Sequence, residues 1–132
     1  MNKDIRWKQR FQNFEKAYHL LETAKKIAHP SATERAGLIQ FFEVTYELAW
    51  KTLKDYLESQ GFQVNSPRDT IKQAFQINLL QDGHTWMEAL ENRNLTTHTY
   101  NEAISLKVES LIKEKYFPLL NQLYDTLKIK VK

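Results

Sequence analysis

Between Ser31 and Gly61 the sequence reads SATERAGLIQFFEVTYELAWKTLKDYLESQG, and this stretch decides the fold. Ser31 and Glu34 have the spacing of a capping box, in which two side chains satisfy backbone donors that a helix start leaves free. Gly61 stands where a glycine commonly ends a helix. Between these signals apolar side chains recur every three or four residues, which predicts one long helix with a buried stripe. The stripe is Ile39, Phe42, Tyr46, Ala49, Trp50, Leu53 and Leu57.

A second apolar row widens this face of the helix. A helix in a small monomeric bundle rarely needs so broad a face, so either another helix of the chain or a second copy of the chain covers it. We expect a subunit interface there, and therefore a homodimer. The row is Leu38, Phe41, Thr45 and Leu48.

Similar signals delimit the first two neighbours of this helix. A preceding helix is predicted from Asp4 to Ala28, and Pro30 ends it because the residue before a proline is pushed away from helical angles. Ser66 and Pro67 start a short helix after Gly61, as N-cap and first helical residue. The buried stripe of the preceding helix is Trp7, Phe11, Phe14, Tyr18, Leu21 and Ala28.

Two further helices are predicted after the break at Asp82-Gly83. Thr85 with Glu88, and Thr99 with Glu102, have capping-box spacing, so we expect these threonines to start the two helices. Pro118 falls inside the last helix and is expected to kink it, because proline removes a backbone donor and clashes with the preceding turn.

The sum is an all-α fold: an up-and-down four-helix bundle with an additional short helix, in one domain spanning residues 1–132. Three glycines and three prolines in 132 residues favour long helices over many turns. With no cysteine, disulfides, thiolate zinc sites and a cysteine nucleophile are excluded. We expect no signal peptide and no membrane span, because no apolar run is long enough, and a cytoplasmic location fits this composition.

The net charge is +3, which permits an anionic partner without requiring one. Basic residues gather at the two ends of the chain, where solvated helix ends are a better explanation than a nucleic-acid footprint. They are Lys3, Arg6, Lys8 and Arg10, then Lys128, Lys130 and Lys132.

The segment Glu91–Tyr100 is the candidate functional site, because an arginine, a histidine and a tyrosine fall together there without apolar periodicity. On an unbroken α-helix, Arg93 and Tyr100 lie within about 20° of each other, whereas His98 lies roughly 140° away from Arg93. For Arg93 and His98 to act on one phosphate, either the helix breaks between them or two copies of the chain meet face to face.

These residue types suit phosphate chemistry. The planar fork of Arg93 matches two phosphate oxygens, and a histidine with an ordinary pKa of about 6.5 exchanges a proton near neutrality. Together, Arg93 and His98 could cleave RNA without a metal or other cofactor, and Asn94 could support the substrate. A polar helix junction with no chemistry is the alternative that the residues alone leave open. We expect no metal site, because the histidines (His19, His29, His84 and His98) lack paired ligand spacing.

The pattern Arg93-Asn94-x-x-x-His98-x-Tyr100 resembles the Arg-x4-His-x-Tyr motif of the HEPN superfamily, in its HepT-like or nucleotidyltransferase substrate-binding-like branch. The similarity extends through residues 42–51, 66–69 and Trp86. One departure is Asn101, where an acidic residue often follows the tyrosine in that family, which puts in doubt how a partner reads the tyrosine.

The resemblance implies a homodimeric helical toxin of a type VII toxin–antitoxin pair. Arg93 and His98 are then the catalytic pair of a ribonuclease, and Asn94 supports them. A cognate minimal nucleotidyltransferase, the antitoxin, is then expected to inactivate the toxin by adenylylation at Tyr100. The alternative is a non-catalytic subunit that binds substrate for, or regulates, a separate nucleotidyltransferase, with the motif serving recognition. A purely structural helical dimer is a third possibility.

Overall fold

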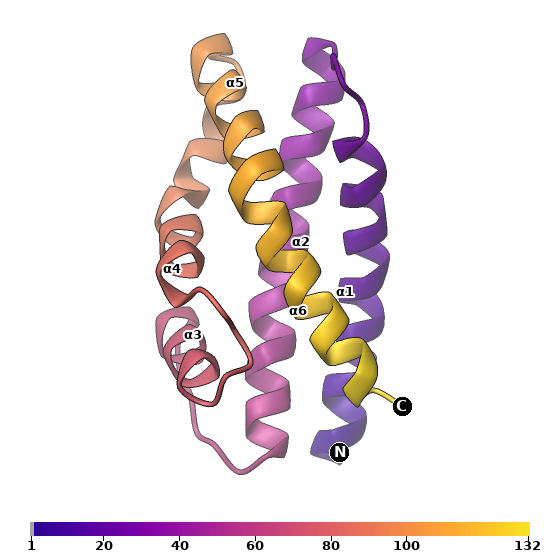
Figure 1. The fold of residues 1–132 in the computed structure, drawn as a ribbon, viewed down its shortest axis with the longest axis vertical. Helices are drawn as coiled ribbons and strands as arrows, with labels where there is room; N and C mark the ends of the chain where they lie inside the picture. Colours follow the sequence, from indigo (N-terminus) through magenta and orange to yellow (C-terminus); the bar gives the residue numbers. More distant parts are fainter. Residues whose placement is uncertain (1) are drawn as a thin grey trace.

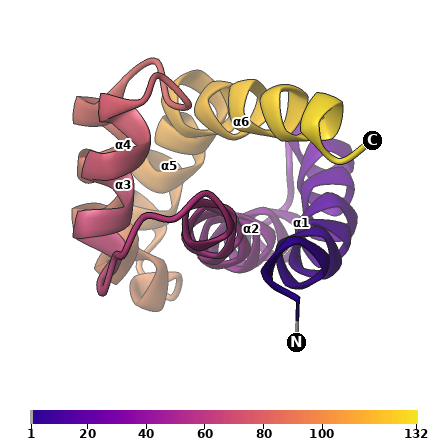
Figure 2. The same ribbon diagram turned by 90° about the horizontal axis from the view of Figure 1, so that it is seen from below.

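The computed structural model describes residues 2–132, and helices are the one kind of regular secondary structure among them. Helices α1 and α2 form an antiparallel pair, and the continuous run from α5 through η2 to α6 crosses them (Figure 1). Helices α3 and α4 occupy the remaining side (Figure 2). The elements are α1 (Lys3–Lys25), α2 (Ala32–Ser59), α3 (Pro67–Gln76), α4 (Gly83–Asn92), η1 (Arg93–His98), α5 (Glu102–Leu111), η2 (Ile112–Tyr116) and α6 (Phe117–Lys130).

The all-α prediction is therefore confirmed. The bundle has three long helical segments, which are α1, α2 and the run from α5 to α6. The two short helices α3 and α4 together occupy the position of the fourth helix. The sequence explains why α3 and α4 are separate, because Asp82 and Gly83 interrupt what could otherwise have been one long helix. The side-chain carboxylate of Asp82 accepts the backbone N–H of Thr85 at 3.0 Å and so caps α4.

Helix α2 is the central element and has the ends that its sequence predicts. The Ser31 hydroxyl accepts the N–H of Glu34 at 3.1 Å, and the Glu34 carboxylate accepts the N–H of Ser31 at 2.9 Å. At the other end Gly61 has φ of 91°, and Phe62 N–H donates to the carbonyl of Leu57 at 3.0 Å. This left-handed glycine closure satisfies carbonyls that a helix end leaves free.

Half of the second apolar row of α2 is buried inside the chain. Leu38 and Thr45 are 1% and 0% exposed, and Phe41 and Leu48 are partly buried against the core. Leu38 and Thr45 are therefore covered by the chain itself, whereas Phe41 and Leu48 keep part of their surface exposed, and the subunit interface on this row stays a prediction. The face that α2 leaves open carries Val44 and Leu48 beside Gln40, Glu43 and Glu47. The homodimer itself stays a prediction.

Three predicted helix ends differ from the structure. Helix α1 ends at Lys25, three residues early, and Ala28 is exposed. Asp82 caps α4 in place of Thr85. Asn101 caps α5 in place of Thr99, since its side-chain oxygen accepts the N–H of Ile104 at 3.1 Å. In both later cases aspartate or asparagine, which rank above threonine as N-caps, takes the cap from a nearby threonine.

Pro118 is accommodated by a π-helical turn, η2, just before it. Phe117 N–H donates to the carbonyl of Ile112, five residues back, so this turn is wider than an α-helical one. The wider turn offsets the donor that proline lacks and the clash of its ring with the preceding carbonyl. The predicted disturbance is present, and it takes the form of a π-turn within a continuous rod.

The basic chain ends lie at the same end of the bundle and are partly paired (Figure 1). Arg10 Nε lies 2.9 Å from a carboxylate oxygen of Asp55, which is 4% exposed, and Arg6 lies 3.6 Å from the other oxygen. Lys128 pairs with Glu15 at 2.7 Å. These ends serve the packing of α1 against α2 and α6. Within residues 2–132, no helix is both long and apolar enough to cross a membrane.

Candidate functional site

The site segment is a 3₁₀-helix, η1, that continues directly from α4. The Thr96 hydroxyl donates to the carbonyl of Arg93 at 2.6 Å, and the Thr97 hydroxyl donates to the carbonyl of Asn94 at 2.9 Å. Two adjacent β-branched residues, with hydroxyls that bond the backbone locally, compete with α-helical hydrogen bonding. Thr96 is buried and anchors the segment, while Arg93, Asn94, Thr97 and His98 are exposed.

Arg93 lines a cavity of about 250 Å³ between η1 and α2. Asn94 and Thr97, one 3₁₀ turn apart, line it from the same side as Arg93. The opposite wall comes from α2 and consists of Phe42, Glu43, Tyr46 and Glu47. The cavity thus combines one guanidinium, two carboxylates, an amide and two aromatic rings.

The positive charge of Arg93 affects the pKa of two side chains on the α2 side of the cavity, Tyr46 and Glu47. Burial raises the pKa of Tyr46 far above its usual range, and the Arg93 charge acts against that rise. The Tyr46 hydroxyl donates to the carbonyl of Trp86 at 2.7 Å. For Glu47, burial raises the pKa, but hydrogen bonds from Trp50 and Lys51, with a smaller contribution from Arg93, outweigh it and lower the pKa overall. Glu47 is therefore a stable anion opposite Arg93.

His98 and Tyr100 form a separate pair on the outer side of the joint. Nδ1 of His98 lies 3.0 Å from the phenol oxygen of Tyr100, and the rings meet edge to face at 5.6 Å. Tyr100 is 82% exposed. A second, more polar cavity of about 390 Å³ adjoins Tyr100 and is lined by Ala32, Arg35, Thr99, Glu102 and Ser105.

The structure contains the predicted break, but the break does not bring the catalytic candidates together. In a 3₁₀-helix with three residues per turn, five residues leave Arg93 and His98 about 120° apart, little better than in an α-helix. His98 does not line the cavity of Arg93, and no hydrogen bond joins the two within residues 2–132. Tyr100 pairs with His98 instead of sharing a face with Arg93.

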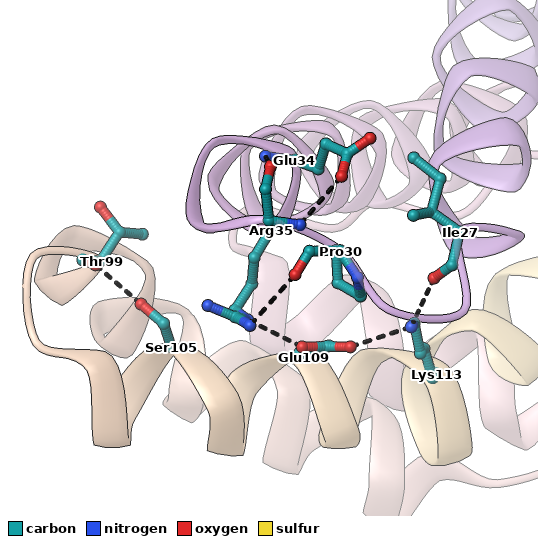
Figure 3. Close-up of polar contacts among 9 residues, drawn as sticks. Ile27, Pro30, Glu34, Arg35, Thr99, Ser105, Glu109 and Lys113 are labelled. Atoms are coloured by element: carbon teal, nitrogen blue, oxygen red, sulfur yellow. Dashed lines mark hydrogen bonds and ion pairs between the residues drawn. The ribbon is translucent and has the colours of Figure 1, made fainter.

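A polar cluster that the sequence did not reveal holds α5 below this joint (Figure 3). Arg35 Nε donates to Glu109 at 2.8 Å, and Lys113 Nζ donates to Glu109 at 2.9 Å and to the carbonyl of Ile27 at 3.0 Å. Burial raises the pKa of Glu109, but the bonds from Lys113 and Arg35 outweigh it and lower the pKa overall. The cluster fixes the start of α2 and the α1–α2 loop against α5.

A short hydrogen bond connects this anchored helix to the site. The hydroxyl of Ser105 donates to the carbonyl of Thr99 at 2.7 Å (Figure 3). Asn101 N–H donates to the carbonyl of His98 at 3.0 Å. Sequence reasoning missed the contact of Arg35 with Glu109, since these residues lie 74 positions apart on elements whose adjacency no local pattern shows. Within residues 2–132, no three histidine or acidic side chains are placed to hold a metal ion.

Three comparisons with known proteins agree with one another. The family described as nucleotidyltransferase substrate binding protein like matches residues 9–129. A protein of Haemophilus influenzae described as a probable ribonuclease HepT is 31% identical over 97 residues. That alignment covers 67% of this chain and 66% of the relative, so slightly less than two thirds of the relative is matched.

Two solved structures share the fold. A crystal structure from Thermus thermophilus superposes with a TM-score of 0.75 at 31% identity, covering 90% of this chain and 98% of that one. A second structure, from Haemophilus influenzae, is described as the fold of a substrate binding domain of a nucleotidyltransferase. It superposes with a TM-score of 0.77 at 25% identity, covering 89% and 98% of the two chains.

Proposed function

This chain belongs to the nucleotidyltransferase substrate binding protein like family, the HepT-like branch of the HEPN superfamily, and on that premise we propose that it is a ribonuclease toxin. It cleaves RNA without a metal, acts in the cytoplasm, and is neutralised by a separate minimal nucleotidyltransferase. The observation that carries the proposal is the joint Arg93–Tyr100, formed by η1 and the two residues after it, which presents Arg93, Asn94, His98 and Tyr100 to solvent on one short segment.

The proposed cleavage divides two tasks between Arg93 and His98. His98 draws the proton from a ribose 2′-hydroxyl, and the oxygen then attacks the adjacent phosphorus. Arg93 stabilises the negative charge of the pentacoordinate phosphate through its planar fork, and Asn94 hydrogen-bonds the substrate. Acid–base help of this kind typically contributes about 10²–10⁴-fold in rate.

The separation of Arg93 and His98 favours a shared site. Since the two side chains point to different sides of η1, we propose a homodimer in which Arg93 and His98 converge with their symmetry mates at the interface. Such an arrangement satisfies the geometric condition that a single chain leaves unmet. Light scattering at micromolar concentration tests it, and a purely monomeric protein that still cleaves RNA would contradict it.

The proposed neutralisation acts on Tyr100. Its phenol is exposed, and a polar cavity adjoins it, so a partner enzyme has access to its oxygen. An adenylyl group there places a phosphodiester anion beside His98, which excludes the RNA phosphate. The test is to incubate the protein with the partner and ATP and to measure its mass; a Tyr100→Phe variant that still gains the adenylyl mass contradicts the assignment.

The catalytic assignment is tested on purified, unmodified protein. Arg93→Ala and His98→Ala should each abolish RNA cleavage and relieve growth inhibition, while His29→Ala, a histidine in the exposed α1–α2 loop, serves as the control. Wild-type cleavage rates in both site variants would overturn it.

A second candidate is a non-catalytic subunit that presents substrate to, or regulates, a nucleotidyltransferase. The acidic wall of the Arg93 cavity favours this alternative, because Glu43 and Glu47 disfavour an RNA phosphate there. The two candidates differ in one measurement, since a non-catalytic subunit binds the partner but leaves RNA intact in the absence of that partner.

A further inference from the structure

The contact between His98 and Tyr100 has a consequence beyond RNA cleavage. Tyr100 is the most exposed large apolar or aromatic side chain among those that the structure describes, yet its hydroxyl is not free. It lies 3.0 Å from Nδ1 of His98, within hydrogen-bond distance. The two rings also meet edge to face, a favourable geometry for an aromatic pair.

A tyrosine needs such a neighbour to act as a nucleophile near neutrality. A phenol has an ordinary pKa of about 10, so nearly all of it is protonated at pH 7 and is a weak nucleophile. A nucleophile of this kind is activated by a general base within about 2.6–3.2 Å. Within residues 2–132, His98 is the one side chain within hydrogen-bond distance of the Tyr100 hydroxyl.

We propose that His98 is the general base that activates Tyr100 for adenylyl transfer. This inference rests on the proposed function, in which Tyr100 is the acceptor, and adds a second chemical task to the same histidine. When Nδ1 is unprotonated, it accepts the hydrogen bond from the phenol, and Nε2 carries the ring proton.

The proposed step forms one bond at phosphorus and breaks another. The phenol oxygen of Tyr100 forms a bond to the α-phosphorus of a nucleoside triphosphate, and its proton passes to Nδ1 of His98. The bond from that phosphorus to the bridging oxygen breaks, and pyrophosphate leaves with the electron pair. His98 then releases its proton to water. The partner nucleotidyltransferase supplies the triphosphate and the ions that hold it.

The backbone around the pair keeps this geometry without a rigid pocket. Asn101 N–H bonds the carbonyl of His98 at 3.0 Å, and the Ser105 hydroxyl bonds the carbonyl of Thr99 at 2.7 Å. The backbone carbonyls of His98 and Thr99 are thus held by Asn101 and by α5, while the His98 and Tyr100 side chains are exposed and accessible to an incoming triphosphate. The proposal also gives the reason why one event silences the toxin: the modification places its phosphodiester beside the same histidine that cleavage uses.

The first experiment needs no partner. An aryl sulfonyl fluoride reacts with an activated phenol, so the labelling rate of Tyr100 in the full-length protein, followed by peptide mass spectrometry, reports its nucleophilicity. His98→Ala should slow labelling about 10²-fold, the lower end of the range of acid–base effects, and added imidazole should restore part of the rate. His29→Ala should label at the wild-type rate.

A matched variant separates proton transfer from positioning. In His98→Asn, the side-chain oxygen can still accept the phenol hydrogen bond, but it cannot take the proton. We expect His98→Asn to label as slowly as His98→Ala. Wild-type labelling in either variant overturns the proposal, since it means that the histidine only orients the tyrosine or has no role in its reactivity.

The second experiment uses the partner nucleotidyltransferase and ATP. Adenylylation of Tyr100 should slow about 10²-fold in His98→Ala relative to wild type and recover in part with imidazole. If wild type is modified and His98→Ala is modified equally fast, the inference fails while the proposed function stands. If wild-type Tyr100 is never modified, both fail.

Discussion

Helix α2 and the joint Arg93–Tyr100 differ in how their local sequence signals agree and in how deeply their side chains are buried. In α2 the caps, the apolar stripe and the glycine closure all favour one structure, and its core side chains are buried. In the joint, two threonine hydroxyls bond the backbone, the helix type changes, and the side chains with chemistry are exposed. The contrast shows that the scaffold carries the stability, and that the site depends on anchors located elsewhere.

The largest expected effect is on the scaffold. Leu53 is 0% exposed in the centre of α2, so Leu53→Ala should lower the free energy of unfolding by about 2–5 kcal/mol. His98→Ala, at an exposed site, should change it by less than about 0.5 kcal/mol. Urea denaturation of both variants checks the contrast. A comparable loss in His98→Ala means that the joint is itself part of the stabilising core.

The next effect concerns the Arg35–Glu109–Lys113 cluster. Glu109→Ala leaves two cations without their half-buried acceptor and should cost about 1–3 kcal/mol. Because the folded protein lowers the pKa of Glu109 from its ordinary 4.5, the contribution of this carboxylate is fully present above pH 4.5 and is lost as the pH falls through the lowered pKa. Stability in Glu109→Gln should therefore fall less steeply below pH 4.5, and an unchanged acid profile contradicts this account.

Alanine substitutions at two glycines, one inside α2 and one just after it, should change the free energy of unfolding by smaller amounts and in opposite directions. Gly61→Ala should cost about 1–2 kcal/mol, since its φ of 91° is left-handed and a side chain resists that conformation. Gly37→Ala, inside α2 with nothing within 4 Å of the added carbon, should stabilise by about 0.5–1 kcal/mol. Thermal unfolding measures both; losses of equal size in the two variants point to side-chain crowding instead.

The smallest expected effects on stability are those of removing two helix N-caps, Ser31 and Asn101. Ser31→Ala and Asn101→Ala each remove one capping acceptor and should each cost about 1 kcal/mol. Asn101→Ala should in addition slow RNA cleavage and the labelling of Tyr100, because Asn101 starts the helix whose Ser105 hydroxyl holds the carbonyl of Thr99, between His98 and Tyr100. Equal activities in the two variants contradict the view that α5 supports the site.

Local rules predicted the scaffold well and the joints less well. The caps at Ser31 and Ser66 and the end at Gly61 are confirmed, because a cap involves only residues within one turn. The caps at Thr85 and Thr99 were wrong, since Asp82 and Asn101 stand close by and start the two helices at other residues, where they accept the N–H groups of Thr85 and Ile104. Sequence spacing identifies a capable residue, but it does not decide between two adjacent ones.

The sequence by itself determined the all-α class, the central helix with its ends, and the motif residues Arg93, His98 and Tyr100, because periodicity and spacing along the chain encode these. Only the tertiary structure decided that Leu38 and Thr45 of α2 are buried within the chain, that Glu47 lies opposite Arg93, and that His98 pairs with Tyr100. The physical reason is that burial and side-chain direction depend on which helices become neighbours. A turn of about 100° or 120° per residue then decides which chemical groups meet.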